Sequence, residues 1–321
     1  MRKTKTIILL MVMTALLMAT DRAAAVTPGQ GEAGLLDTYQ RNKARLASTS
    51  FGLPLFLESV ERDDRVHVDV YGIFDYSFSS VVNMLKVPAN WCDIVSLHQN
   101  VKACTHRDLP EPQLTFYIGK KTYQFPEDVR QVIYQYRIVA LQESYLDIDL
   151  SASAGPFGTK GHKMRFEALP LKGGKTFVHV SYEYKDSVAL RLAAKVYFAT
   201  FGLSKVGFTV TAKDRSGKPV YIGGPRGSIE RNAVRYYLAI QAFMNTVSYP
   251  EEKRFGKSLR AWYDLTDRYR KQLFELEKEN YLRIKTMEHK NQAALQRRIW
   301  TGLQLVPEAD KPVTMQLKKA H

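Results

Sequence analysis

Polar and hydrophobic residues alternate at the start of residues 65–74, which predicts that this segment is a β-strand with one buried face. The hydrophobic positions are Val66, Val68 and Val70, and the polar positions between them are Arg65, His67 and Asp69. The Asp63-Asp64 pair just before them predicts a turn. Residues 53–61, on the other side of this turn, are predicted to form the partner strand of a hairpin.

Farther along the chain, short hydrophobic stretches predict two short helices and then a run of strands. The helices cover residues 77–85 and 88–97, and Pro88 suits a first helical turn. The strands cover residues 101–106, 113–118, 132–140, 144–150, 163–171 and 176–184. Short turns between successive strands favour an antiparallel meander.

Hydrophobic residues at steps of three and four predict further helices around this meander. These helices cover residues 35–47, 187–201, 228–247 and, almost without interruption, 258–298. A second hairpin is predicted from residues 206–211 and 219–222. Ser228 is the expected N-cap of the helix at 228–247, so the segment Gly223–Ser228 is expected to be a loop that leads into it.

The first 25 residues have the three-part layout of a secretory signal peptide. Three basic residues precede a hydrophobic run over residues 7–18, and three alanines at 23–25 provide a cleavage site. A membrane anchor or a buried helix is the alternative, but the run is shorter than the roughly 20 residues that span a bilayer. We therefore expect an exported, periplasmic protein whose signal peptide is cleaved after about Ala25.

The net charge narrows the set of expected partners. The chain holds 47 Lys and Arg residues against 32 Asp and Glu residues, a formal net charge of +15. Loss of residues 1–25 removes four basic side chains and one acidic side chain, which leaves +12. In an exported protein this charge favours an anionic membrane surface or an envelope protein over nucleic acid, although solubility alone also accounts for it.

The sequence contains two cysteines, Cys92 and Cys104. In an oxidising compartment such a pair is expected to form a disulfide. Closing a loop of about 13 residues stabilises a fold by roughly 3 kcal/mol on the loop-entropy model. Two free thiols are one alternative, and a nucleophilic Cys92 with His98 and Asn100 nearby in the sequence is another.

Familiar catalytic and metal-binding motifs are absent from the sequence, including HExxH, G-x-S-x-G, the P-loop and clustered Cys/His ligands. We therefore expect no catalytic residue, no metal and no cofactor. The Gly223–Ser228 segment is the best candidate for an anion-binding loop, because the backbone N–H groups at a helix N-terminus favour anions. Arg226 would add a guanidinium fork. A tight turn followed by an N-cap is the alternative.

The order of the predicted elements, together with several local segments, points to a known fold. The segments are Tyr71–Phe78, Val81–Leu85, Pro88–Asp93, Phe177–Tyr182 and Ser228–Val247. They resemble the helix-grip fold of the START-like superfamily, also called SRPBCC or the Bet v1-like, polyketide cyclase/lipid-transport superfamily. The resemblance implies an exported bacterial member with an α+β fold, in which a curved antiparallel sheet wraps around a long C-terminal helix.

The sequence patterns and the resemblance together divide the chain into five parts. These are a signal peptide (1–25), a linker with a short helix (26–49), a START-like domain (50–249), a basic helical extension (250–305) and a flexible tail (306–321). The extension departs from the simple family pattern, and so do the elements inserted over residues 187–222.

Members of that superfamily leave a hydrophobic cavity between sheet and helix, and many bind lipids, sterols or polyketides. The resemblance thus implies binding or transport of a lipid or another hydrophobic ligand next to the helix at 228–247. The residues expected to line the site are His179, Tyr182, Tyr184, Tyr236, Tyr237, Ile240 and Met244. One alternative is a cyclase- or hydrolase-like enzyme with His179, Glu183 or Asp149 in the cavity. Another is an envelope scaffold that acts through its C-terminal helix.

Overall fold

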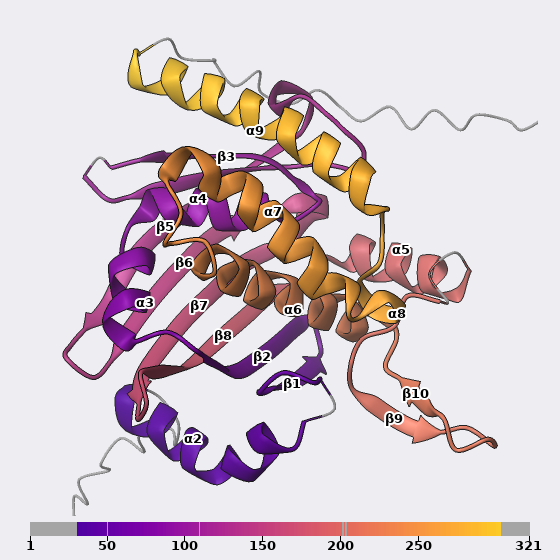
Figure 1. Cartoon of the computed structure of the whole chain (residues 1–321). Helices are drawn as coiled ribbons and strands as arrows, with labels where there is room; N and C mark the ends of the chain where they lie inside the picture. Colours follow the sequence, from indigo (N-terminus) through magenta and orange to yellow (C-terminus); the bar gives the residue numbers. More distant parts are fainter. Residues whose placement is uncertain (1–30, 50, 109, 201, 203, 303–321) are drawn as a thin grey trace, which may run out of the picture.

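The computed structural model describes residues 31–49, 51–108, 110–200, 202 and 204–302. It is an α+β structure built on one large curved sheet, with helices stacked over one face and along one edge (Figure 1). The expected signal peptide (1–25) and tail (306–321) lie outside the described residues. Within the described part of the chain, no helix has both the length and the hydrophobic character that crossing a bilayer requires.

Eight strands form the sheet in the order β1-β2-β8-β7-β6-β5-β4-β3, and all neighbours are antiparallel. The strands are β1 (Leu55–Arg62), β2 (Arg65–Phe74), β3 (Val101–Arg107), β4 (Gln113–Ile118), β5 (Arg130–Leu141), β6 (Leu146–Ala154), β7 (Lys160–Leu171) and β8 (Lys175–Lys185). The predicted meander is therefore confirmed as β3 to β8. It joins the first hairpin because β2 pairs with β8 along its whole length.

The remaining elements of the first 250 residues are mostly helical. They are α2 (Gly31–Ala47), α3 (Phe78–Leu85), α4 (Pro88–Ser96), the short turns η1 (Pro126–Asp128) and η2 (Pro156–Gly158), α5 (Val188–Ala199), β9 (Val210–Lys213), β10 (Pro219–Tyr221) and α6 (Gly224–Met244). The side chain of Ser77 caps α3 by accepting a hydrogen bond from the backbone N–H of Ser80. In the same way Ser187 caps α5.

The long helix α6 lies across one face of the sheet, with α7 (Glu251–Asp267) stacked on it (Figure 1). This arrangement confirms the predicted helix-grip architecture. The contact with the sheet is very close at Gly72 of β2, where a Cβ atom would lie 2.0 Å from the hydroxyl oxygen of Tyr237. The missing side chain at Gly72 thus gives the Tyr237 ring room to lie directly on the strand.

The first turn of α6 corrects one prediction. The helix begins at Gly224 with Gly223 as its N-cap, so the segment that was expected to be an anion-binding loop is already helical. Proline is favoured in a first helical turn, and Pro225 occupies that position. The turn packs tightly, because a Cβ atom at Gly227 would lie 2.7 Å from the carbonyl oxygen of Ile222.

The C-terminal region forms three helices where the sequence pattern predicts one. After α7 come α8 (Arg270–Leu273) and α9 (Lys278–Trp300). The backbone leaves the helical conformation at Tyr269 and again at Phe274, which has a ψ angle of 131°. The chain turns between these points, so Trp262 of α7 stacks on Tyr281 of α9 with ring centroids 5.1 Å apart. Both rings belong to the main core. Residues 250–302 therefore pack as part of the same body as the sheet.

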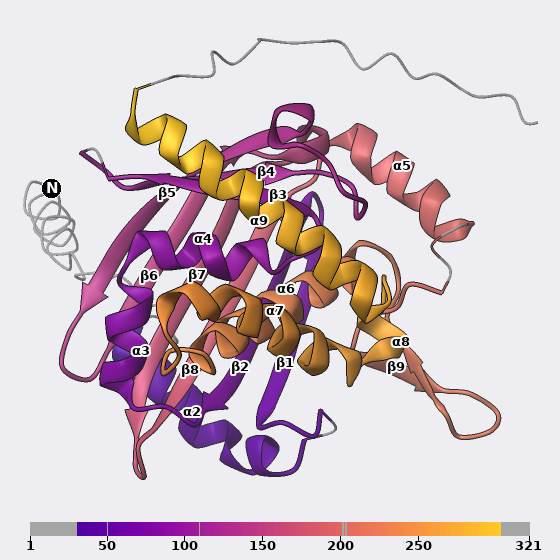
Figure 2. The ribbon, with the colours of Figure 1, turned by 45° about the horizontal axis from the view of Figure 1, so that its top comes forward.

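Helix α9 runs along β3, the edge strand of the sheet (Figure 2). The side chain of Gln292 accepts a hydrogen bond from the backbone N–H of Cys104 at 2.7 Å. Gln296 accepts from the N–H of His106 at 2.8 Å and donates to its carbonyl at 3.0 Å. Unpaired backbone groups make an edge strand prone to association with other strands, and these two glutamines satisfy several of them.

The opposite, outer face of the sheet is partly covered by α2. Leu35 and Leu46 of this helix are buried in a small second core that includes Phe177 of β8. Successive side chains of a strand point to opposite faces. Phe177 and His179 therefore share the outer face, whereas Tyr182 and Tyr184 face α6.

Candidate ligand-binding site

Three of the predicted site residues come together between the sheet and α6. The ring of Tyr182 lies 5.8 Å from that of Tyr184 on the same strand and 6.4 Å from that of Tyr236 on α6. Both β8 positions face α6 because they are two residues apart. The structure thus supports the grouping of these three tyrosines.

Two further residues join this group, and sequence reasoning missed both. Nδ1 of His162 on β7 lies 3.0 Å from the hydroxyl oxygen of Tyr182, and its ring is stacked 5.4 Å from that of Tyr184. Tyr134 of β5 lies in the same region. Burial raises its pKa, and the nearby hydroxyls of Tyr182 and Tyr236 raise it further. We call Tyr134, His162, Tyr182, Tyr184 and Tyr236 the interior cluster. The alternation of inward-facing and outward-facing positions along β5 and β7 is the sequence signal that could have identified Tyr134 and His162.

The interior cluster is uncharged at neutral pH. Burial raises the pKa of Tyr182, Tyr184 and Tyr236 above the usual range of a phenol. Burial also lowers the pKa of His162 to about 4, so its imidazole is neutral. The cluster therefore offers neutral hydroxyl and imidazole groups that can donate or accept hydrogen bonds, inside a wall that is otherwise hydrophobic.

The other three α6 residues that were predicted to line the ligand site lie in a different environment. Tyr237, Ile240 and Met244 are each at most 1% exposed and belong to the main core. The ring of Tyr237 packs against Phe74 at a centroid distance of 5.3 Å, above Gly72. The structure thus places these three side chains in the packed core.

His179 lies on the outer face of the sheet, away from the tyrosines with which the sequence analysis grouped it. Its Nε2 atom lies 2.8 Å from a carboxylate oxygen of Asp69, and its Nδ1 atom lies 2.7 Å from one of Glu167. Hydrogen bonds to Asp69 and Glu167 outweigh the effect of burial and raise the pKa of His179 to about 9. The side chain is a protonated link between two carboxylates.

The residues named for an enzyme on this scaffold share that outer face. Glu183 pairs with Arg65 at 3.2 Å, and Asp149 lies 3.6 Å from Lys163. Together with His179 they form ion pairs on the side of the sheet remote from α6. The structure therefore does not bring these groups into the space behind α6. Within the described residues, no set of three His, Cys, Asp or Glu side chains is arranged to hold a metal ion.

Arg226, the predicted anion-binding residue, lies in the first turn of α6. Its Nε atom donates a hydrogen bond to the hydroxyl oxygen of Ser59 at 2.7 Å. It borders an open groove of about 580 Å³ between the end of α2, β1 and residues 208–210. Arg226 thus lines this groove, whose lining includes no residue of the interior cluster.

Both cysteines form the Cys92–Cys104 disulfide, which joins α4 to β3. This confirms the predicted pairing and leaves neither a free thiol nor a nucleophilic Cys92.

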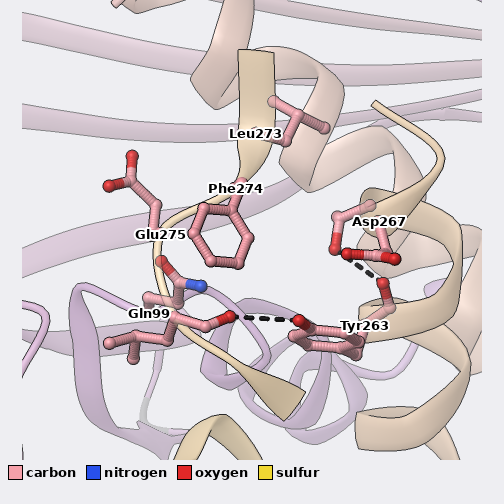
Figure 3. A pocket seen from close by; sticks show the side chains of 8 residues that line it. Gln99, Tyr263, Asp267, Leu273, Phe274 and Glu275 are labelled. Atoms are coloured by element: carbon pink, nitrogen blue, oxygen red, sulfur yellow. Dashed lines mark hydrogen bonds between the residues drawn. The ribbon is translucent and has the colours of Figure 1, made fainter. Parts of the chain in front are cut away.

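A very small cavity lies beside α7 and the segment that links α8 to α9 (Figure 3). Its volume is about 10 Å³, and its walls include Gln99, Tyr263 and Glu275. A space of this size holds at most one water molecule. It is therefore no ligand site in itself, although it lies against a buried carboxylate, that of Glu275.

Comparison with known proteins adds a likeness in fold. No protein-family model and no curated protein matches the chain. Among solved structures, norcoclaurine synthase from Thalictrum flavum matches with 10% identity over 47% of this chain and 82% of that chain, at a TM-score of 0.31. A START superfamily protein from Mycobacterium smegmatis matches with 14% identity over 42% and 88%, at a TM-score of 0.29. Human StAR-related lipid transfer protein 5 matches with 10% identity over 53% and 88%, at a TM-score of 0.28.

At these scores the fold assignment depends on the chain's own geometry. The strand before the two short helices pairs with the last strand of the meander, and α6 then lies across the sheet. The second of these features is the one that the sequence resemblance implies. The described chain therefore has a helix-grip fold.

Proposed function

We propose that this protein binds a lipid or another hydrophobic small molecule between the sheet and α6, beside the interior cluster. One observation carries the proposal. Tyr182, Tyr184 and Tyr236 keep part of their surface accessible, although surrounding protein raises the pKa of all three hydroxyls. This combination is expected for side chains that border an enclosed space, since packed core leaves no accessible surface.

The chemistry of this region fits an amphipathic ligand. The side chains of Leu150, Met164 and Val180 are buried on the same face of the sheet and supply a hydrophobic wall. The phenols and the imidazole of the interior cluster supply a few neutral polar groups. Ligand sites of this type hold the body of a molecule by hydrophobic contact and orient it by a small number of hydrogen bonds.

Binding of a fluorescent long-chain fatty acid to the purified protein tests the proposal, alongside mass spectrometry of lipids extracted from it. Tyr182→Phe and Tyr236→Phe each remove one hydroxyl group while keeping the ring. Each should weaken binding about fivefold, because one hydrogen bond contributes about 1 kcal/mol. Tyr39→Phe on the outer face is the matched control and should bind as the wild type does. No extracted lipid and no probe binding would refute the proposal.

We also propose that the protein works after export, in the periplasm. The layout of residues 1–25 and the paired cysteines support this location. Cell fractionation followed by N-terminal sequencing should find a chain that begins near Val26. A chain that retains Met1 and fractionates with the cytoplasm would contradict it.

A further inference from the structure

Basic side chains gather around a single buried carboxylate next to the interior cluster. Nζ of Lys121 and Nζ of Lys205 lie 2.6 Å and 2.9 Å from Oε2 of Glu275. Nη2 of Arg235 on α6 lies 3.1 Å from Oε1 of the same carboxylate. Figure 3 shows this carboxylate beside the small cavity. One negative charge thus faces three positive charges from three separate segments of the chain.

Arg231, one helical turn before Arg235, adds a fourth positive charge. It is only 6% exposed, and its Nη1 atom is buried without a hydrogen-bond partner. The nearby carboxylate of Glu230 is already engaged, because it accepts hydrogen bonds from Ser59, Phe208 and Thr209. Burial lowers the pKa of Arg231 despite the charges of Glu275 and Glu230. A buried guanidinium nitrogen that lacks a hydrogen-bond partner is costly, and a bound anion would supply that partner.

Arg235 is in electrostatic contact with the interior cluster. The ring of His98 stacks on that of Tyr236 at a centroid distance of 5.1 Å. Burial, and next the charge of Arg235, lower the pKa of His98 well below its usual value. Arg235 also acts on the hydroxyl of Tyr236. The basic group and the neutral polar group therefore adjoin each other along α6.

We propose that Arg231 and Arg235 bind the acidic group of an amphipathic ligand, a carboxylate or a phosphate, while its hydrophobic part lies beside the interior cluster. The inference rests on the proposed function and specifies the ligand as an anionic one. Guanidinium groups suit this task because their fork pairs with two oxygen atoms of a carboxylate or phosphate at once. Lys121 and Lys205, which are partly exposed, mark the side from which such an anion would arrive.

A matched pair of probes separates this inference from the proposed function. The probes are a fluorescent long-chain fatty acid and its methyl ester, which have the same chain but differ in charge. The wild type should bind the acid at least tenfold more tightly than the ester. Arg231→Gln should lose that preference and bind the ester unchanged. Arg260→Gln, which removes an exposed arginine of α7, should behave as the wild type does.

The stability of the unliganded variant gives a second measurement. If the role of Arg231 is to bind a ligand, Arg231→Gln should unfold at the same or a higher urea concentration than the wild type. The reason is that the substitution removes an unpaired buried charge. If Arg231 instead stabilises the fold, its replacement by Gln should lower the free energy of unfolding. Lower stability of Arg231→Gln together with equal binding of acid and ester would overturn the inference.

The remaining outcomes are also decisive. Tight binding of the ester with no preference for the acid refutes the anionic site and leaves the proposed function standing. If neither probe binds, the proposed function fails. If inorganic phosphate alone raises the melting temperature of the wild type but not of Arg231→Gln, and neither probe binds, the anion is a free oxyanion and both proposals fail.

Discussion

Replacing His179 by Gln should destabilise the protein strongly at neutral pH and far less at alkaline pH. His179 lies between Asp69 and Glu167 on the outer face of the sheet, with both imidazole nitrogens hydrogen-bonded to carboxylates. Its side chain is 11% exposed, so solvent screens these ion pairs only weakly. The ring also stacks on that of Tyr71 at a centroid distance of 4.4 Å.

The magnitude follows from the shift in pKa. The folded protein raises the pKa of His179 from 6.5 to about 9, and each pKa unit corresponds to about 1.4 kcal/mol. The protonated imidazole therefore contributes about 3 kcal/mol to the free energy of unfolding. Because the folded-state pKa is the higher one, this contribution is complete below about pH 6.5. It declines as the pH rises toward about 9 and is lost above that value.

Urea unfolding at about pH 6 and about pH 10 measures the effect. The destabilisation by His179→Gln should be about 3 kcal/mol larger at the lower pH. His106→Gln on β3 is the control, because burial lowers the pKa of His106, which is the opposite of the shift at His179. Any destabilisation of that variant should not be larger at the lower pH, because a histidine with a lowered pKa in the folded state contributes no stability there. An equal destabilisation of His179→Gln at both pH values would refute the reasoning. Its affinity for the fatty-acid probe should match that of the wild type, since the sheet separates His179 from α6.

Two further predictions concern stability. Gly72→Ala should lower the free energy of unfolding by about 1–3 kcal/mol, because the added Cβ atom would lie 2.0 Å from the Tyr237 hydroxyl oxygen. In the same urea assay, Gly256→Ala in α7 should raise it by about 0.5–1 kcal/mol, since nothing lies within 4 Å of that Cβ. A destabilised Gly256→Ala would contradict the packing argument. Reduction of the Cys92–Cys104 disulfide should lower the free energy of unfolding by about 3 kcal/mol, and an unchanged melting temperature in reducing buffer would show that the bond contributes nothing.

Alternation along β8 shows how far the sequence alone could reach. The strand itself is clear from its pattern, and the structure extends it by only one residue at each end, to Lys175–Lys185. The pattern also separates the two faces of the strand. His179 is an odd number of residues from Tyr182 and Tyr184, so it points to the opposite face. The pattern does not tell which face meets the long helix. The charged face turned out to be the outer one, where histidine, aspartate and glutamate form ion pairs in place of a ligand site.

The first turn of α6 shows a different limit. Glycine and proline at positions 223–225 are equally typical of a loop and of a helix start, and Ser228 is a good N-cap in sequence terms. The choice depends on packing, because Gly227 fits closely against the carbonyl oxygen of Ile222. Local propensity cannot anticipate such a contact.

Arg231 and Arg235 could not be recognised from the sequence for a related reason. In isolation they look like the polar positions of an amphipathic helix, four residues apart and free to reach solvent. They are buried because the segments that carry Lys121, Lys205 and Glu275 close over that part of α6. These segments come from three places up to 154 positions apart in the chain. Tertiary packing thus buries positive charges that are costly to bury. As a result, one guanidinium nitrogen of Arg231 and one of Arg235 lack a hydrogen-bond partner, beside a set of neutral hydroxyls. A bound acidic group would satisfy these nitrogens in a way that no other side chain in the described part of the chain does.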